Sequence, residues 1–138
     1  MAREVKPIET TDELKETVAR FLPKGSENKV LAQIFQALRI EVNEEMKVLE
    51  MFLSQCADVL NPGGRLVVLS YHSLEDRLVK NFMKTGNADG NLEKDFFGNQ
   101  LTPYKLITSK PIVPSDDEVQ MNSRARSAKL RVAERRSK

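Results

Sequence analysis

Apolar side chains recur at helical spacing through the first sixty residues of the chain. A short amphipathic pattern over residues 11–22 predicts a helix of about three turns, whose first turn Thr11 would cap. A longer pattern over residues 27–60 contains two successive apolar stripes, and the Asn-Glu-Glu sequence at 43–45 has the chemistry of a new helix start. We therefore expect a break or bend at residues 39–43.

The pattern then changes to that of a strand followed by a helix. Asn61-Pro62-Gly63-Gly64 ends the helical stretch, because proline cannot continue a helix and glycine tolerates positive φ. Residues 65–70, RLVVLS, form a short and continuously apolar run, which is typical of a strand covered on both faces. Ser73 is placed to cap a helix over residues 73–84. Helix, turn, strand and helix in this order indicate an α/β unit.

The last third of the chain predicts a loop and two more strands. Residues 85–102 are rich in glycine and asparagine and lack a period, which indicates a surface loop. Residues 104–110 read as a strand ended by prolines, and residues 115–119 as the capped start of one helical turn. Residues 127–136 alternate in polarity, which predicts a last strand with one buried face. That buried face is expected to carry Ala128, Leu130 and Val132.

Composition places the chain among ordinary soluble proteins. Its 138 residues are 40% hydrophobic and 30% charged, enough for one domain with a single core. No apolar run is long enough to span a bilayer and no signal-peptide core is present, so we expect a cytoplasmic protein. With one histidine and one cysteine, a metal site is not expected; Cys56 reads as a packing residue on a helix.

Positive charge is concentrated at the C-terminal end. Between Arg124 and Lys138 a single acid, Glu134, stands against the basic residues Arg124, Arg126, Lys129, Arg131, Arg135, Arg136 and Lys138. This asymmetry favours an anionic partner, and nucleic acid in particular, over a solvated edge strand guarded by charges. The candidates for phosphate contacts are Arg124, Arg126 and Lys129. Aromatic residues for base stacking are sparse, which argues against sequence-specific reading of single strands by this chain alone.

Two motifs that could suggest catalysis are better explained by structure. A phosphate-cradling loop follows a strand and opens a helix, whereas Gly63-Gly64 follows a helix and precedes a strand, so it reads as a turn. His72 and Ser73, with the acids that follow them, have the residue types of a hydrolytic triad. Adjacent side chains at a helix start diverge, however, so a small hydrolase is the weakest of the functional readings.

The position of these residues carries more weight than their identity. The carboxyl end of a buried strand in an α/β sheet is where ligands bind, and Tyr71, His72 and Ser73 follow such a strand. They are therefore the candidates for lining a substrate pocket. Packing beneath the following loop is the alternative for the same residues.

Several segments together resemble one known family. The chain closely resembles the ribosomal RNA small subunit methyltransferase H family, also called MraW, in order and over nearly all of its length except the 85–102 loop. The members of that family use S-adenosyl-L-methionine to methylate N4 of a cytidine in 16S ribosomal RNA. The segments that carry the resemblance are IETTDEL, FQALRIEVNEE, LNPGGRLVVLSYHSLEDRLVKNFM and KPIVPSDDEVQMNSRARSAKLRVAE.

The resemblance implies a fold and a division of the chain. We expect the C-terminal half of a class I, Rossmann-like methyltransferase: a small mixed sheet of one strand plus an antiparallel pair, flanked by helices. Residues 65–70, 104–110 and 128–134 would be the fifth, sixth and seventh strands, with the seventh lying between the other two. Residues 1–34 would end an inserted helical substrate domain, and residues 35–138 would belong to the methyltransferase domain.

The resemblance also implies what this chain lacks. Family members carry a GGGGHS-like loop and a DLGVSS-like segment that hold S-adenosyl-L-methionine, and neither occurs in this sequence. We therefore expect no cofactor-binding residue in this chain, and no activity from it alone. Tyr71, His72 and Ser73 would line the acceptor side, while the catalytic residues stay unknown.

Partners follow from the same comparison. The expected partner is 16S ribosomal RNA in the small ribosomal subunit, and no membrane. The fifth strand would have a free apolar edge, which predicts self-association through that edge or exchange of the N-terminal helices between chains. A freestanding RNA-binding or protein-interaction module without catalysis is the alternative function.

Overall fold

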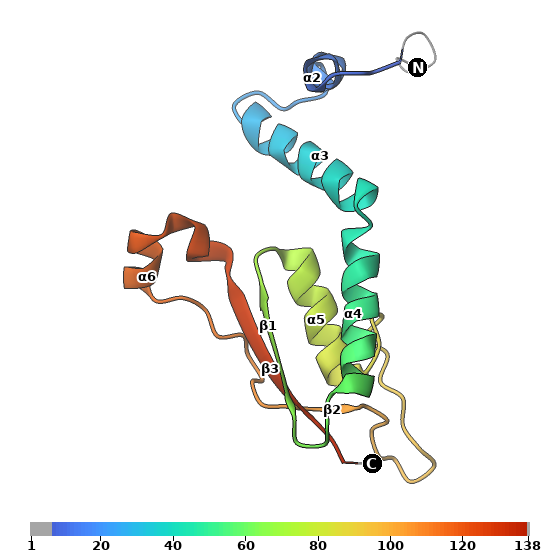
Figure 1. Cartoon of the computed structure of the whole chain (residues 1–138). Coiled ribbons are helices and arrows are strands. Elements are labelled where there is room, and N and C mark those ends of the chain that lie inside the picture. Colours follow the sequence, from blue (N-terminus) through green and yellow to red (C-terminus); the bar gives the residue numbers. More distant parts are fainter. Residues whose placement is uncertain (1–6, 138) are drawn as a thin grey trace. The chain divides into compact units, whose positions relative to one another are not determined.

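The computed structural model describes residues 7–137 and divides into two compact units, Met1–Glu45 and Met46–Lys138. We describe each unit by itself (Figure 1). The boundary expected after residue 34 concerns domains of the family and stays a prediction. The elements are α2 (Thr11–Ala19), α3 (Glu27–Val42), α4 (Glu45–Val59), β1 (Arg65–Ser70), α5 (Ser73–Thr85), β2 (Tyr104–Leu106), α6 (Asp116–Met121), the 3-10 helix η1 (Ser123–Ser127) and β3 (Lys129–Arg135).

The first unit contains two helices whose starts and ends follow from local chemistry. The cap of α2 is Thr10, one residue earlier than expected: its hydroxyl accepts from the backbone N–H of Glu13 at 3.2 Å. The Glu13 carboxylate in turn accepts from the backbone N–H of Thr10, which completes a capping box. Because this reciprocal pair satisfies two free N–H groups, it sets the helix start more firmly than Thr11 could.

The predicted break between the long helices is confirmed. Helix α3 ends at Val42, and Glu44 has a positive φ of 50°, a conformation that stops a helix. Arg39 Nε lies 2.8 Å from Glu45 Oε1, so an ion pair spans the break. The polar Asn-Glu-Glu sequence therefore does separate two apolar stripes, as its pattern indicated.

The second unit is built on a three-stranded sheet in the order β1-β3-β2. Strand β3 is antiparallel to both neighbours, so β1 and β2 run in the same direction on either side of it. Leu66 lies opposite Ala133, and Leu106 also lies opposite Ala133. This arrangement confirms the α/β class and the expected order, with the last strand inserted between the other two.

The core lies on the face of the sheet that α4 and α5 cover (Figure 1). Leu53 of α4 and Val79 of α5 are almost completely buried, and they pack in one cluster with side chains from all three strands. Cys56 is partly buried against the same cluster, as predicted. The remaining members of the cluster are Leu66, Phe82, Met83, Tyr104 and Ala133.

The opposite face of the sheet is open among the described residues. Val67 and Leu69 of β1 are 54% and 50% exposed, so the expectation of a strand covered on both faces is wrong for this chain. The run RLVVLS is apolar on both faces, but helices pack against only one of them here. Leu130 and Val132 lie opposite these residues and continue the same face.

The buried face of β3 differs from the one expected, although Ala128, just before the strand, is buried as predicted. Arg131 and Ala133 are its buried strand residues, whereas Leu130 and Val132 are only half-buried. Alternation alone suggested that the apolar residues would point inward. The side toward α5 instead accommodates a charged residue, because that helix supplies a counter-ion.

The loop between α5 and β2 is ordered by its own polar residues, and the expectation of a loop here is confirmed. Helix α5 ends at Thr85, and Gly86, with a φ of 84°, caps it in the left-handed conformation. The Asn87 side chain accepts from the backbone N–H groups of Gly90 and Asn91. Phe96 and Phe97 lie at the tip with their rings almost fully exposed.

None of the described helices is long and apolar enough to cross a membrane.

Candidate functional site

The glycine turn before β1 has no free backbone donor for an anion. The N–H of Gly63 donates to the carbonyl of Arg135 at 2.9 Å, and the N–H of Gly64 donates to the carbonyl of Asn61 at 2.8 Å. Both amides therefore hold the turn and the end of β3 together. The reading of Gly63-Gly64 as a turn is confirmed, and this loop does not fit the phosphate or carboxylate of a cofactor.

At the carboxyl end of β1, Glu75 organises the start of α5. Its Oε2 accepts from the backbone N–H of Tyr71 at 3.0 Å and from that of His72 at 3.4 Å. His72 and not Ser73 occupies the cap position, so the helix starts one residue earlier than a Ser73 cap would require. Glu75 therefore binds the backbone that precedes the helix.

The three pocket candidates do not share one environment. Tyr71 is 55% exposed, His72 is half-buried and Ser73 is exposed. His72 Nε2 lies 3.2 Å from Glu75 Oε1, in a geometry that is not a hydrogen bond. Among residues 7–137 no hydrogen bond joins the Ser73 hydroxyl to His72 or to an acid, so these side chains do not form a hydrolytic triad.

Asp76 has a role that the sequence did not reveal. Its carboxylate accepts from Arg131 Nε at 2.7 Å and Nη2 at 3.2 Å, a two-point ion pair between α5 and β3. Lys129 Nζ lies 3.3 Å from the same carboxylate. Asp76 therefore binds cations of β3 and not a neighbour along its own helix. Its partners are 53 and 55 residues away along the chain, which local patterns do not disclose.

The ion pair also sets the acidity of Asp76. The hydrogen bond from Arg131 lowers the pKa of this carboxyl below its usual value; burial opposes the shift, and the charges of Arg131 and Lys129 add to it. Because the side chain of Arg131 is 9% exposed, this is a buried pair whose members depend on each other.

Most of the basic residues at the C-terminal end have structural partners. Arg135 donates to the carbonyls of Ala57 and Pro103, and Arg136 donates to the carbonyl of Tyr104. Together with Arg131 and Lys129 they join β3 to its neighbours, so the run of charge is not simply a surface for an anion. Lys138 lies outside the described residues.

Arg124 and Arg126 differ from these residues. Both are exposed on η1, the short helix that leads into β3. No carboxylate is paired with either guanidinium in the part of the chain that the structure describes. Of the three phosphate candidates they are the pair whose charge is open to solvent, whereas Lys129 is already close to Asp76.

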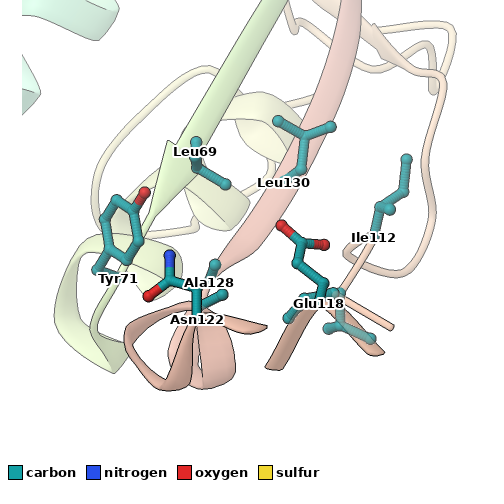
Figure 2. Close-up of a pocket in the computed structure, with 10 residues that line it drawn as sticks. Leu69, Tyr71, Ile112, Glu118, Asn122, Ala128 and Leu130 are labelled. Carbon is teal, nitrogen blue, oxygen red and sulfur yellow. The ribbon is translucent and has the colours of Figure 1, made fainter. Parts of the chain in front are cut away.

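A cavity of about 330 Å³ opens beside the end of β1. Tyr71 stands on the β1 side, Leu69 and Leu130 come from the open sheet face, and Ile112 closes the far side (Figure 2). Glu118 and Asn122 bring polar groups from α6 and its end, and sequence reasoning did not single out either residue. Of the three pocket candidates only Tyr71 lines this cavity.

Within residues 7–137, no group of acids, histidine and cysteine gathers in a form suited to a metal ion.

The sheet order and the helix that follows β1 are consistent with part of a Rossmann-like methyltransferase. Comparison with known proteins agrees: the family model described as the MraW methylase family matches residues 1–136. The chain belongs to the MraW methylase family.

Curated relatives carry the name ribosomal RNA small subunit methyltransferase H. The relative from Parabacteroides distasonis is 59% identical over 134 residues, which are 97% of this chain and 44% of that protein. The relative from Flavobacterium johnsoniae is 58% identical over 134 residues, with the same coverage of 97% and 44%. The chain therefore spans less than half the length of the curated relatives that it matches.

We predict that Asp76→Asn destabilises the protein by about 3 kcal/mol, the usual cost of breaking a buried ion pair, because it leaves Arg131 buried without a counter-ion. Urea unfolding at pH 7 measures the change. Asp117→Asn, which removes an exposed charge from α6, is the matched control and should change stability little.

The pH dependence gives a second measurement of the same pair. Since the pKa of Asp76 is lower in the folded state than its ordinary value of 3.8, its stabilising effect is complete above that value and is lost as the pH falls through the folded pKa. The difference in free energy of unfolding between wild type and Asp76→Asn should therefore become smaller in acid. A gap that stays constant from pH 7 to pH 2 would show that the charge of Asp76 is not the cause.

Proposed function

We propose that this chain is part of an S-adenosyl-L-methionine-dependent methyltransferase that modifies N4 of a cytidine in 16S ribosomal RNA. Membership of the MraW methylase family carries this proposal. The name of the curated relatives, ribosomal RNA small subunit methyltransferase H, supports the substrate class. A cytoplasmic location is part of the same proposal, since ribosomal RNA is the substrate.

In this proposal the chain supplies part of the RNA-facing surface. Arg124 and Arg126 contact phosphates with their exposed guanidinium groups, and Lys129 lies beside them in sequence. Tyr71 faces the acceptor RNA from the end of β1, together with His72 and Ser73. Methyl transfer to an exocyclic amine depends on placing the donor and the amine in line, so a surface that binds only one of them is inactive alone.

The methyl donor does not fit the residues of this chain. Both glycine amides of the turn before β1 are already paired with backbone carbonyls. The sequence has no other Gly-rich stretch between a strand and a helix start. We infer that S-adenosyl-L-methionine is held by the part of the relatives that has no counterpart in this chain, and that this chain does not bind it alone.

A freestanding RNA-binding or protein-interaction module is the second candidate function. The observation that favours it is the exposed arginine pair on η1, which needs no donor site to bind RNA.

We also propose that the chain self-associates. Strand β1 is an edge strand with one unpaired side, and its open face carries Val67 and Leu69 half exposed. A six-residue apolar edge is a template for pairing with a second strand. Exchange of the N-terminal helices between chains is the other route to the same outcome.

The enzyme proposal predicts that activity needs a second segment. Calorimetry should show no binding of S-adenosyl-L-methionine to this chain alone. Mixing it with the N-terminal part of a relative, the part that this chain does not match, should give transfer of labelled methyl groups to 16S ribosomal RNA. Micromolar binding of the donor by the isolated chain would contradict the proposal.

The arginine pair predicts salt-sensitive RNA binding. Arg124→Ala with Arg126→Ala should weaken binding of single-stranded RNA about tenfold and reduce the slope of affinity against salt by about two, as expected for two lost phosphate contacts. Fluorescence anisotropy at several salt concentrations measures both. Lys80→Ala with Lys84→Ala removes two exposed charges from α5 and is the control. An equal effect of both pairs would assign the binding to net charge alone.

The open edge predicts association at tens of micromolar in a sedimentation experiment. Val67→Lys with Leu69→Lys should shift the chain toward monomer, because two charges on β1 oppose pairing and stacking. Val59→Lys is the control, since Val59 is 80% exposed at the end of α4 and lies off the sheet. A wild-type chain that sediments as a single monomeric species would refute self-association.

A further inference from the structure

A hairpin tip in the loop between α5 and β2 carries two exposed phenylalanines. Phe96 and Phe97 are 98% and 86% exposed, the highest values among the large apolar side chains of the described residues. Their rings lie edge to face, with 5.7 Å between the centroids and 87° between the ring planes. Aromatic side chains gathered in water at one point of a surface indicate contact with another molecule.

Local hydrogen bonds hold this tip in one shape. The Asp95 carboxylate accepts from the backbone N–H of Phe97 at 2.9 Å and from that of Asn99 at 2.8 Å. The backbone N–H of Asp95 donates to the carbonyl of Asn99 at 2.9 Å, and Gly98 turns the chain with a φ of 84°. Because the tip is ordered before it meets a partner, binding through it loses little conformational entropy.

The base of the loop is fastened to the second unit. Asn81 Nδ2 of α5 donates to the carbonyl of Ala88 at 3.1 Å, and the Thr85 hydroxyl contacts the carbonyl of Asn87 at 3.3 Å. Gly86 lies so close to Pro103, the residue before β2, that an added Cβ would come within 2.7 Å of its ring. The tip therefore projects from a loop that is held at both of its ends.

The tip and the exposed arginine pair lie at opposite ends of the sheet. Helix η1 leads into Lys129, which pairs with Ser70 at the carboxyl end of β1. The loop leads into Tyr104, which pairs with Arg135 at the other end of β3. Figure 1 shows α6 and the loop, yellow to gold, at these two ends. The tip therefore meets a different surface from the one that the arginines and Tyr71 face.

The charge around the tip favours protein over RNA as the partner. Residues 85–102 contain three acids, Asp89, Glu93 and Asp95, and one of the basic residues, Lys94. Aromatic side chains that stack on the bases of RNA are set among cations, which bind the phosphates. The acids beside Phe96 and Phe97 would repel phosphates instead. They attract the lysine and arginine side chains that proteins bound to RNA carry.

We propose that the tip binds a basic protein of the small ribosomal subunit, at an apolar pocket bordered by lysine or arginine. Phe96 and Phe97 fill the pocket, and the carboxylates of Asp89 and Glu93 pair with the cations at its rim. The chain thus binds RNA at one end of the sheet and protein at the other. The proposal rests on the proposed function in taking the small ribosomal subunit as the partner assembly; it does not depend on methyl transfer.

Photo-cross-linking of the chain to purified small ribosomal subunits identifies the partner. Benzoylphenylalanine in place of Phe97 should join the chain to a ribosomal protein, in a product that ribonuclease leaves intact and mass spectrometry identifies. The same photoreactive residue in place of Val59, which is 80% exposed at the end of α4, is the control and should not give this product. A cross-link from position 97 to 16S ribosomal RNA or to a second copy of the chain, or none at all, would overturn the proposal.

Two double variants separate the rings from the charge. Phe96→Ala with Phe97→Ala should weaken binding to small subunits about tenfold and leave binding to protein-free 16S ribosomal RNA unchanged. Asp89→Lys with Glu93→Lys should also weaken binding to subunits, whereas a tip that meets RNA would bind more tightly after this change. Co-sedimentation with subunits and filter binding of the RNA measure these affinities. All four side chains are exposed, so far-UV circular dichroism should show unchanged folds.

Tighter binding of the lysine variant to subunits, or an equal loss of affinity for protein-free RNA in the alanine variant, would assign the tip to RNA and refute the proposal. The outcome is separable from that of the proposed function. Methyl transfer to protein-free 16S ribosomal RNA by the mixed segments tests the enzyme, and the cross-link tests the tip. Transfer without a protein cross-link would refute this proposal alone, and a protein cross-link without transfer would count against the enzyme alone.

Discussion

The ion pair between Asp76 and Arg131 is the constraint on which the arrangement of the second unit depends. It joins the first turn of α5 to the middle strand of the sheet, at a distance of 2.7 Å between Asp76 Oδ1 and Arg131 Nε. It therefore holds α5 against β3, beyond the segment that links the carboxyl end of β1 to α5. Tyr71 belongs to that segment and forms one wall of the cavity.

The two faces of the sheet have different roles. One face is closed by α4 and α5 and contains the core. The other exposes Val67 and Leu69 and ends at the cavity that Glu118 and Asn122 line. An apolar face of this kind indicates further contacts. The chain spans 44% of the length of its first curated relatives, so these proteins have ample sequence with which to cover it.

Much of the fold could be predicted because its signals are local. The break before Glu45, the turn at Gly63-Gly64, β1 and the loop after α5 all follow from residues within a few positions of each other. The site was less accessible. Tyr71 was found from its place after a strand, but Glu118 was read only as part of a capped helical turn. Nothing in its neighbourhood along the chain shows that the turn folds back beside β1.

The sequence by itself determined the secondary structure and the family, because periodicity, turn chemistry and the family's motifs are written in contiguous residues. The tertiary structure alone decided how the charges are used. Arg131, Arg135 and Arg136 looked like one basic surface with Arg124 and Arg126, yet the first three bind a carboxylate and backbone carbonyls. Whether a cation is available to a partner depends on acceptors brought close by folding, and these acceptors lie tens of residues away along the chain.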